Sequence, residues 1–324
     1  MIYWILYLVI MVAIELVYFS IAGRYSIIDK PNQRSSHINP TIRGGGIIFI
    51  FGLGIWFFHT TFAWPYFVLG SAIVSIISFS DDIRPQASWI RVVVHVAAIL
   101  LLFYQVQLYE WNWLLVLLAG IVCIGTLNAF NFMDGINGIT GIYALVNLAT
   151  FWFIDAYVVD FTDSTLLISL AGANAIFLFF NFRKRATCFA GDVGSVTLAF
   201  LQIFFLLQLI KTTDSLFWVL MFFVFGIDST ITILYRIKRR ENIFKAHRTH
   251  LYQFLSNELQ LDHRLIAVAY GIVQCVLNVL LIYYLPAKSA MIPILTAALV
   301  LFFYIAGREN VIRKIKRRLK IDSF

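Results

Sequence analysis

The sequence predicts an all-α protein that crosses a membrane many times. Its 324 residues are 61% hydrophobic and only 13% charged, which is more apolar side chain than one water-soluble core can bury. Apolar stretches of about 20 residues, the length of a membrane helix, follow one another along most of the chain. No internal repeat or second soluble domain interrupts them. We therefore expect one integral-membrane domain over residues 1–324, with a basic tail at 308–324.

We expect about 11 transmembrane helices, each of about 20 residues. The first, at the N-terminus, lacks a basic start and a small-residue cleavage site, so it is interpreted as an uncleaved helix. The second is weakened by Gly52 and Gly54, and the third follows so closely that residues 61–65 must form a tight turn. The expected helices are centred near Val9, Leu53, Ser71, Leu100, Leu118, Leu145, Leu170, Phe204, Phe222, Val276 and Leu299.

The basic residues predict the orientation of these helices. Assigning alternate loops to two sides places all but two of the 25 Lys and Arg on one side, the exceptions being Lys211 and Lys288. Because short basic loops stay in the cytoplasm, we expect the N-terminus outside and the C-terminus inside. This topology also explains the net charge of +8, so we expect contact with membrane lipids and no nucleic-acid partner. The three cysteines show no spacing typical of disulfides or zinc.

Four polar insertions fall on the predicted cytoplasmic side, in alternate connections. They contain Asp81 and Asp82, the segment 128–138, Asp192, and the segment 246–253. A transporter would instead place ionisable groups near the middle of broken helices, and here the middle of the spans is almost free of charge. The pattern favours a catalytic or binding surface on one side of the membrane.

The segment NAFNFMDGING carries four polar residues at a spacing of three. If the helix continues through it, Asn128, Asn131, Asp134 and Asn137 lie on one face and can hold a polar ligand. The alternative is a helix end capped by Asn and Asp, which explains one or two of these residues.

The aspartates predict a metal site. In FAGDVGS, Asp192 stands directly before an apolar helix, an arrangement that suits a metal ligand beside a phosphate-binding helix N-terminus. A plain N-cap is the alternative. Asp81 and Asp82 end a predicted span and could supply a metal ligand and a base, although a solvated helix end is an equally simple interpretation.

Two cytoplasmic loops combine histidines with arginines. In the last loop, histidines three residues apart could grip a phosphate, and no further ligands for zinc lie nearby. In the first, cations precede three glycines and could meet an anionic ligand, or the loop could simply be solvated. The candidates are Arg34, His37 and Arg43 in the first loop, and His247, Arg248 and His250 in the last.

Taken in order, these motifs resemble the polyprenyl-phosphate N-acetylhexosamine-1-phosphate transferases of glycosyltransferase family 4. The resemblance rests on PNQRSSHINPTIRGGG, DD, NAFNFMDG, FAGDVGS and HRTHLYQ, which together span about two thirds of the chain. It implies transfer of an N-acetylhexosamine-1-phosphate from a uridine-diphosphate sugar to undecaprenyl phosphate, with release of UMP. The implied cofactor is Mg²⁺, with Mn²⁺ as the alternative.

The resemblance also implies roles for individual residues. Asp192 and Asp82 would be metal ligands, and Asp81, Asp82 and Asp192 would be the catalytic carboxylates. Asn131 and Asp134 would shape the nucleotide-sugar pocket, Phe189 would stack on uracil, and the histidine-rich loop would lie near the diphosphate. The implied substrate-binding residues are Asn128, Asn131, Asp134, Asn137, Phe189, His247, Arg248, His250, Arg34, His37 and Arg43.

The chain departs from parts of the family pattern. HRTHLYQ and PTIRGGG replace the His triplet and TPTMGG-type loop of the muramoyl-pentapeptide enzymes. This favours the branch that starts O-antigen or other surface glycans, with N-acetylglucosamine or deoxy-N-acetylhexosamine donors. Asn137 stands where a second aspartate is usual. The implied location is the bacterial inner membrane, with the site on the cytoplasmic face, and a homodimer remains open. A lipid or solute transporter and an inactive binding scaffold are the alternatives.

Overall fold

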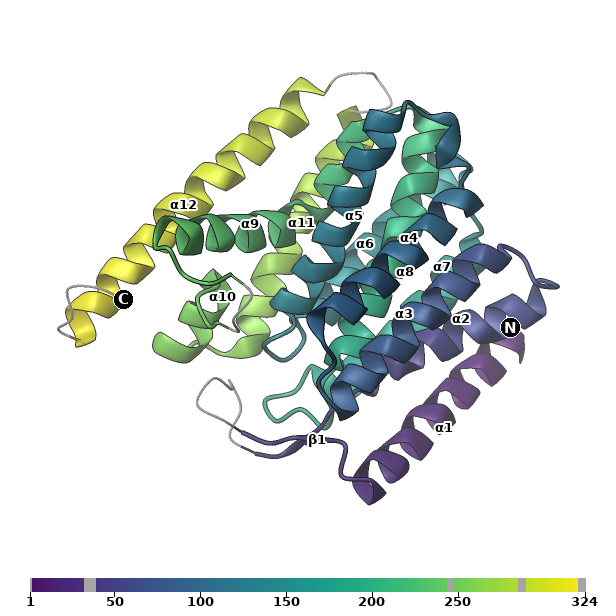
Figure 1. Ribbon diagram of the computed structural model, residues 1–324, viewed down its shortest axis with the longest axis horizontal. Helices are drawn as coiled ribbons and strands as arrows, with labels where there is room; N and C mark the ends of the chain where they lie inside the picture. Colours follow the sequence, from purple (N-terminus) through teal and green to yellow (C-terminus); the bar gives the residue numbers. More distant parts are fainter. Residues whose placement is uncertain (1, 32–38, 244–246, 285–289, 320–324) are drawn as a thin grey trace.

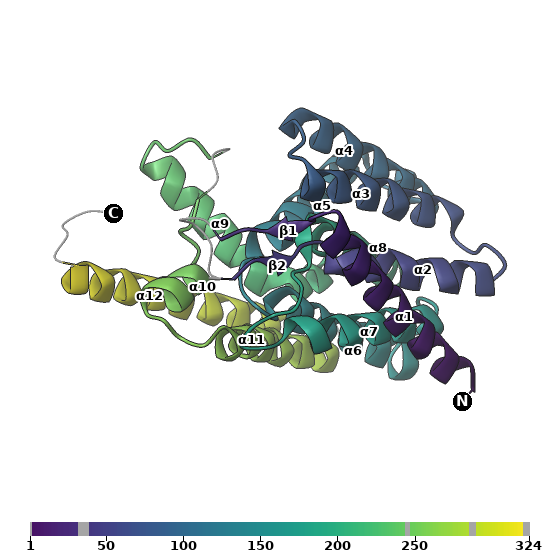
Figure 2. The same ribbon diagram turned by 90° about the horizontal axis from the view of Figure 1, so that it is seen from below.

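The computed structural model describes residues 2–31, 39–243, 247–284 and 290–319, and the candidates Arg34 and His37 lie outside these ranges. The described chain is a bundle of helices with one short two-stranded ribbon (Figures 1 and 2). The first half contains α1 (Ile2–Arg24), β1 (Ile28–Asp29), β2 (Thr41–Ile42), η1 (Gly45–Ile47), α2 (Ile48–His59), α3 (Pro65–Ile83), α4 (Ser88–Gln105), η2 (Leu108–Glu110), α5 (Trp113–Met133) and α6 (Ile139–Tyr157). The second half contains α7 (Ser164–Asn181), α8 (Gly191–Thr213), η3 (Leu216–Phe222), α9 (Phe223–Lys238), α10 (Leu251–Gln253), η4 (Phe254–Glu258), α11 (His263–Tyr284) and α12 (Met291–Leu319).

Each of the eleven predicted membrane segments is helical. Among the described residues, ten helices are long and apolar enough to cross a membrane. The weak second candidate is α2, which has 12 residues and is therefore only about 18 Å long at 1.5 Å per residue. The predicted tight turn after it is confirmed, because α2 ends at His59 and α3 begins at Pro65, with Thr61, Phe62 and Trp64 in left-handed conformation. The all-α membrane fold is confirmed, and the number of complete spans remains ten or eleven.

Local sequence signals set several helix boundaries. Pro65 opens α3, where its missing N–H costs no hydrogen bond. Asn112 and Asp163 cap α5 and α7 by accepting the backbone N–H two residues later, at 2.9 and 2.7 Å. Gly138 has φ of +87°, which L-residues rarely adopt, and it turns the chain into α6. These boundaries place the polar connections at the ends of the helices.

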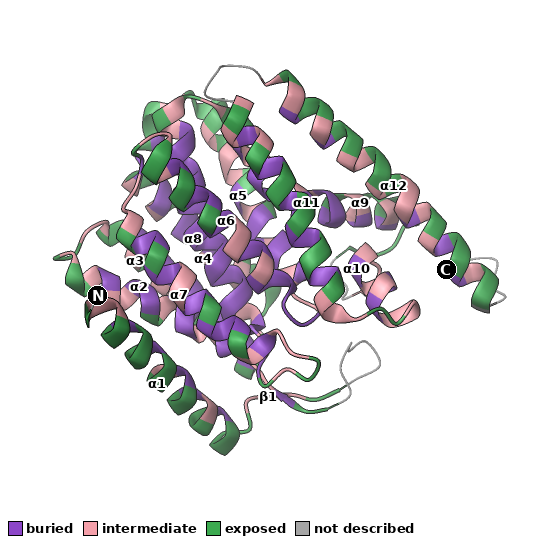
Figure 3. Ribbon diagram, turned by 180° about the vertical axis from the view of Figure 1, so that it is seen from behind, coloured by how far each residue is buried: buried purple, intermediate pink, exposed green. Residues whose placement is uncertain are grey.

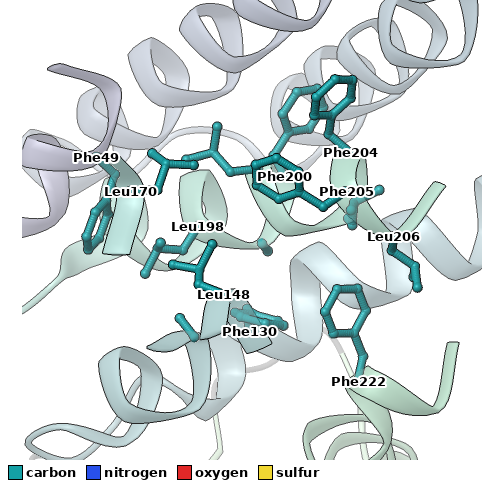
Figure 4. Close-up of a cluster of buried hydrophobic side chains, with 14 of the residues drawn as sticks. Phe49, Phe130, Leu148, Leu170, Leu198, Phe200, Phe204, Phe205, Leu206 and Phe222 are labelled. Carbon is teal, nitrogen blue, oxygen red and sulfur yellow. The ribbon is translucent and has the colours of Figure 1, made fainter. Parts of the chain in front are cut away.

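Helix α8 is the centre of the bundle. In its most apolar stretch 94% of the residues are buried, against 17% for α12, and Figure 3 shows the exposed residues concentrated on outer helices such as α1 and α12. Phe200, Phe204 and Phe205 of α8 pack with residues from α5, α6 and α7, as Figure 4 shows. A helix that is apolar on all sides is typical of the interior of a membrane bundle. Asp192, at its start, is therefore carried by the most deeply buried of the long described helices.

The ribbon of β1 and β2 was not predicted from the sequence. Ile28 pairs with Ile42 and Asp29 with Thr41 in antiparallel register. Ile42 also forms a parallel bridge with Cys188, so the ribbon lies against the connection between α7 and α8. Two-residue strands carry no alternating pattern, and this pairing depends on a contact almost 150 residues away in sequence. The ribbon brings the glycines of the first loop to the start of α8.

The polar motifs lie at one end of the helix bundle, which is the end that carries β1. In Figure 1 the chain begins at the end of α1 that is remote from β1, whereas α12 runs down towards the end where β1 lies. Helix α9 leaves the bundle at a steep angle to α11 in both views (Figures 1 and 2). The polar motifs gather at the β1 end, as their predicted position in alternate loops requires.

Candidate active site

Five charged residues from four segments form what we call the aspartate–arginine cluster: Arg43, Asp81, Asp82, Arg91 and Asp192. Arg43 contacts Asp82 at 2.7 Å and Asp192 at 3.1 Å. Arg91 contacts Asp81 at 3.2 Å and Asp192 at 3.7 Å. The structure thus brings all three predicted catalytic carboxylates together. Asp192 is the shared partner of both arginines.

Asp82 anchors the start of α8. One of its oxygens accepts the N–H of Asp192 at 2.8 Å and the other accepts the N–H of Val193 at 2.9 Å. These are among the N–H groups that a helix leaves without an internal partner. With Arg43 as its third partner, the Asp82 side chain has no exposed surface, whereas that of Asp192 is 18% exposed. Asp82 therefore orients Asp192, and Asp192 is the carboxylate open to a ligand.

The glycine loop packs directly on α8. Gly45 and Gly46 donate their N–H groups to the carbonyls of Phe189 and Ala190, at 2.8 and 3.0 Å. A Cβ on Gly46 would lie 2.1 Å from the Cα of Gly194, a distance that no side chain can occupy. Gly46 is therefore needed for the close approach of the two backbones, whereas a Cβ on Gly45 would meet the side chain of Cys188. This approach is what sets Arg43 beside Asp82 and Asp192.

The connection between α5 and α6 is not helical, contrary to the expectation for residues 128–138. Helix α5 ends at Met133, and Asp134 has the non-helical ψ of 59°. The predicted single face of four polar side chains is therefore wrong, because α5 ends at Met133 and Asn137 lies outside the helix. Asn137 is buried and donates to the carbonyl of Arg183 at 2.7 Å, and Asn128 donates to that of Ile124 at 2.8 Å.

Two residues of this segment, Asn131 and Asp134, border the same cavity as Asp192. The amide of Asn131 lies 3.4 Å from Ser195 in α8 and also hydrogen-bonds Asp192. Asp134 lies near the hydroxyl of Thr140. Removal from bulk water raises the pKa of Asp134 to about 7, although the hydroxyl of Thr140 acts in the opposite direction. Asn131 and Asp134 both border the cavity described below, and their role in holding a sugar nucleotide stays a prediction.

The histidine-rich loop reaches the same site. The rings of His247 and His250 lie 4.9 Å apart, and Phe132 lies 6.1 and 6.2 Å from them. Burial, followed by the nearby charges of His250 and Arg236, lowers the pKa of His247 to about 4, so this ring is neutral at pH 7. Arg248 instead contacts Glu258 at 3.6 Å, away from the two histidines.

A cavity of about 1090 Å³ joins these groups. Its polar wall comes from the cluster, the end of α5 and the histidines, and its apolar wall comes from α4, α5, α9 and α12. The polar residues include Arg91, Asn128, Asn131, Asp134, Asp192, His247 and His250, and the apolar ones include Val92, Val122, Phe223 and Leu301. Such a cavity suits an amphipathic ligand with a charged head and an apolar chain.

Phe189 is held through its backbone. Its N–H donates to the carbonyl of Ile42 at 2.8 Å, and its own carbonyl accepts from Gly45. The ring is half-buried and does not border the cavity. The structure does not test whether the ring of Phe189 stacks on uracil, which stays a prediction.

Two residues of α4, Arg91 and His95, were not predicted as site residues from the sequence. Both border the cavity. Their spacing of four on a helix that follows DD was an available signal, since residues four apart share a helix face.

The donor set fits a hard cation that uses few protein ligands. No group of three or more His, Cys, Asp or Glu is arranged to hold a metal within the described ranges. Mg²⁺, however, is commonly bound through one or two carboxylates together with water and substrate phosphates. Asp192 borders the cavity and can offer such a carboxylate, whereas the oxygens of Asp82 already accept three donors. Asp82 as a metal ligand stays a prediction.

Parts of the chain are similar to known proteins. A family model described as "Glycosyl transferase family 4" matches residues 64–210, which include Asp81, Asp82 and Asp192. The probable undecaprenyl-phosphate N-acetylglucosaminyl 1-phosphate transferase of Bacillus subtilis is 24% identical over 84% of this chain and 78% of its own length. The phospho-N-acetylmuramoyl-pentapeptide-transferase of Thermotoga petrophila is 30% identical over 45% of this chain and 47% of its own.

The similarity to the pentapeptide transferases is thus confined to about half of each protein. That of Streptococcus pyogenes serotype M6 is 43% identical, but over 23% of this chain and 22% of its own length. The ordered motifs, the convergence of their side chains on one cavity and the family match lead to the same conclusion. Residues 64–210 of the chain match glycosyl transferase family 4, and the chain is a phosphoglycosyltransferase, like the relatives named above.

Proposed function

We propose that the protein transfers an N-acetylhexosamine-1-phosphate from a UDP-sugar to undecaprenyl phosphate and releases UMP. The observation that carries this proposal is the cavity, whose charged wall continues into an apolar wall between α4, α5, α9 and α12. A sugar nucleotide can bind at the charged wall. A lipid phosphate needs the charged wall for its head group and the apolar wall for its chain. The product, a lipid-linked diphosphate sugar, would start O-antigen or another surface glycan.

The charges of the cluster fit this reaction. An oxygen of the lipid phosphate attacks the phosphorus that carries the sugar, and the bond from this phosphorus to the oxygen of UMP breaks. Both reactants are anionic, so their approach requires positive charge. Burial lowers the pKa of Arg43, but Asp82 and Asp192 outweigh this effect and raise it overall, so its guanidinium stays charged beside the site. Arg91, 35% exposed at the cavity, is placed to meet a phosphate.

A divalent ion would complete this balance. Asp192 would hold Mg²⁺, which supplies charge neutralisation for the diphosphate and its leaving group. Asn131 would keep the Asp192 carboxylate oriented, and Asp82 would fix the backbone that carries it. A phosphate monoester is already largely dianionic at pH 7, since its second pKa is about 6. The acceptor therefore needs little help from a base, and Asp81 serves mainly to hold Arg91.

The membrane orientation is part of the proposal. The excess of basic residues near the motif-bearing end of the bundle supports a cytoplasmic site, where nucleotide sugars are available. This places the N-terminus outside and the C-terminus inside, with the bacterial inner membrane as the location. The substrates UDP-N-acetylhexosamine and undecaprenyl phosphate would then meet at the membrane surface.

The test is UMP release by the purified protein in nanodiscs with Mg²⁺, undecaprenyl phosphate and a panel of UDP-N-acetylhexosamines. We expect release with at least one donor, and loss of release on chelation of the metal. Asp192→Asn should be inactive, whereas Asp160→Asn should be active, because Asp160 is exposed and lies outside the motif-bearing loops. A folded protein that releases no UMP from any donor would refute the proposal. Lipid or solute movement that survives Asp192→Asn would favour a transporter instead.

A further inference from the structure

A second carboxylate, Asp228 of α9, is surrounded by hydrogen-bond donors. Its Oδ1 lies 3.0 Å from Nδ1 of His250, 3.3 Å from the N–H of Leu251 and 3.4 Å from Oγ1 of Thr232. Its Oδ2 accepts the hydroxyl of Tyr270 at 2.6 Å. We call Asp228, Thr232, His250, Leu251 and Tyr270 the Asp228 network. Asp228 has no exposed surface and His250 is 1% exposed, so water does not compete for these bonds.

The network determines which nitrogen of His250 carries a proton. A carboxylate that faces donors on both oxygens is an acceptor, so Nδ1 must donate to it. Nδ1 then keeps its proton whether the ring is neutral or charged. Nε2 is left as the nitrogen that can gain or lose a proton, and the hydrogen bond at the first nitrogen fixes the role of the second.

Nε2 of His250 has no hydrogen-bond partner among the described residues, and it is buried. A buried polar atom without a partner is uncommon and costs free energy. His250 borders the cavity together with Asn131 and Asp134. The missing partner is therefore expected to come from the ligand.

We propose that Asp228 is a positioning residue that fixes His250 so that Nε2 is presented to a phosphate oxygen of the substrate. This inference rests on the proposed function. In the imidazolium form both ring nitrogens are donors, so Nε2 donates to the phosphate while Asp228 balances the charge of the ring. His247, neutral at pH 7 and 4.9 Å away, adds no competing positive charge. Both the UDP-sugar and the lipid phosphate have phosphate oxygens, and the KM measurements described next distinguish the two substrates.

Two replacements of His250 separate this role from mere anchoring of the loop. In His250→Gln the side-chain amide can occupy the place of Nε2, and in His250→Asn it can occupy the place of Nδ1. We expect kcat/KM to fall about 10-fold in the Gln variant and about 100-fold in the Asn variant, since a bond to a charged group is lost only in the latter. A rise in KM for the UDP-sugar identifies its diphosphate as the ligand, and a rise for the lipid identifies the acceptor. If the Asn variant is as active as the Gln variant, the proposal is wrong.

Asp228→Ala and Tyr270→Phe form a second pair. Each removes a partner from the Asp228 network, but only the first removes the acceptor of Nδ1. We expect Asp228→Ala to raise the same KM that His250→Asn raises, and Tyr270→Phe to leave it within about twofold. Equal rises in both variants would overturn the proposal. If Asp228→Ala does not fold, the His250 pair decides.

Failure of the proposed function is distinguished by a measurement without turnover. Nitrogen-15 NMR of labelled histidines reports which ring nitrogen carries the proton, and the His250 signals are assigned by their loss in His250→Gln. We expect a proton on Nδ1 in the wild type and a change at Nε2 on addition of UDP or a short-chain lipid phosphate. A protein that releases no UMP but shows this pattern refutes only the proposed reaction. A proton on Nε2 alone refutes the positioning role.

Discussion

The aspartate–arginine cluster and the Asp228 network hold carboxylates in opposite ways. In the cluster the partners are arginines with side chains 33% and 35% exposed, and Asp192 is partly open to the cavity. In the network Asp228 and its partners His250 and Thr232 are fully or almost fully buried. Ion pairs at an exposed site exchange easily with a ligand, whereas buried pairs are costly to break. We infer that the aspartate–arginine cluster interacts with the charges of the substrates, whereas the Asp228 network holds His250 in one orientation.

The largest expected effect is the loss of activity in Asp192→Asn, which should not be matched by an equal loss of stability. Asp192→Asn should lower kcat by about 10²–10³-fold, because a charge that acts on the transferred phosphoryl group is lost. Its unfolding temperature should remain close to that of the wild type, since the side chain is partly exposed. Asp228→Asn should lower the unfolding temperature more than Asp192→Asn does. UMP release and thermal unfolding in nanodiscs measure both.

The comparison would fail if both substitutions changed activity and unfolding temperature in the same proportion. Asp160→Asn, at an exposed position, serves as the control for the assay and for handling of the protein.

Asp82 tests the comparison from within the cluster, because it is buried like Asp228. Asp82→Ala should lower the free energy of unfolding by about 3–5 kcal/mol, since Arg43 loses its fully buried partner and keeps only the partly exposed Asp192, and the start of α8 loses its cap. Asp81→Ala is the matched variant, and its cost should be about 1 kcal/mol because Arg91 is partly exposed and keeps Asp192 as a partner. Reversible unfolding in mixed detergent measures both. Equal costs would show that burial does not distinguish the two aspartates.

The close approach of the glycine loop to α8 is expected to have a smaller effect. Gly46→Ala introduces a Cβ that meets Gly194, so the loop must move and the free energy of unfolding should fall by about 1–3 kcal/mol. Gly54→Ala is the control, since its Cβ would meet nothing within 4 Å and alanine favours the helix. We expect Gly46→Ala also to raise KM for the substrates, because Arg43 is displaced. An unchanged unfolding curve would place the loop outside the rigid part of the site.

The sequence predicted the parts of this site that depend on local pattern. The helices follow from long apolar runs, and the motif residues Asp81, Asp82 and Asp192 follow from polar groups at their ends. Their meeting on one side followed from topology, because alternate connections of membrane helices share a side. Arg91 was missed because a basic residue near a membrane surface has an adequate explanation in topology alone.

The remaining features depend on contacts that no local pattern records. Asn137 was predicted to share a face with Asn131, but α5 ends at Met133 and the amide of Asn137 instead donates to the carbonyl of Arg183. The network at Asp228 joins residues of α9 to His250 and to Tyr270 in α11, up to 42 positions apart. Such pairings follow from packing, which spacing within one segment cannot reveal.

The smallest expected effect concerns Asp134, which borders the cavity between the two regions. Its pKa is raised by burial to about 7 in the folded protein, against 3.8 for an ordinary aspartate. Between about pH 4 and 7 the folded protein retains this proton and the unfolded chain has lost it, so stability falls as the pH rises through this interval. Asp134→Asn removes the ionisable group and with it this part of the pH dependence.

We therefore expect the unfolding temperature of Asp134→Asn to gain a few degrees relative to the wild type between pH 4.5 and 7.5, with no substrate present. Asp160→Asn, exposed in the wild type, should follow the wild-type curve in the same buffers. Parallel curves for Asp134→Asn and the wild type would mean that Asp134 ionises as freely as an exposed carboxylate. Asp134 would then resemble the partly exposed charged residues around Asp192, and only Asp228 and His250 would represent the buried region.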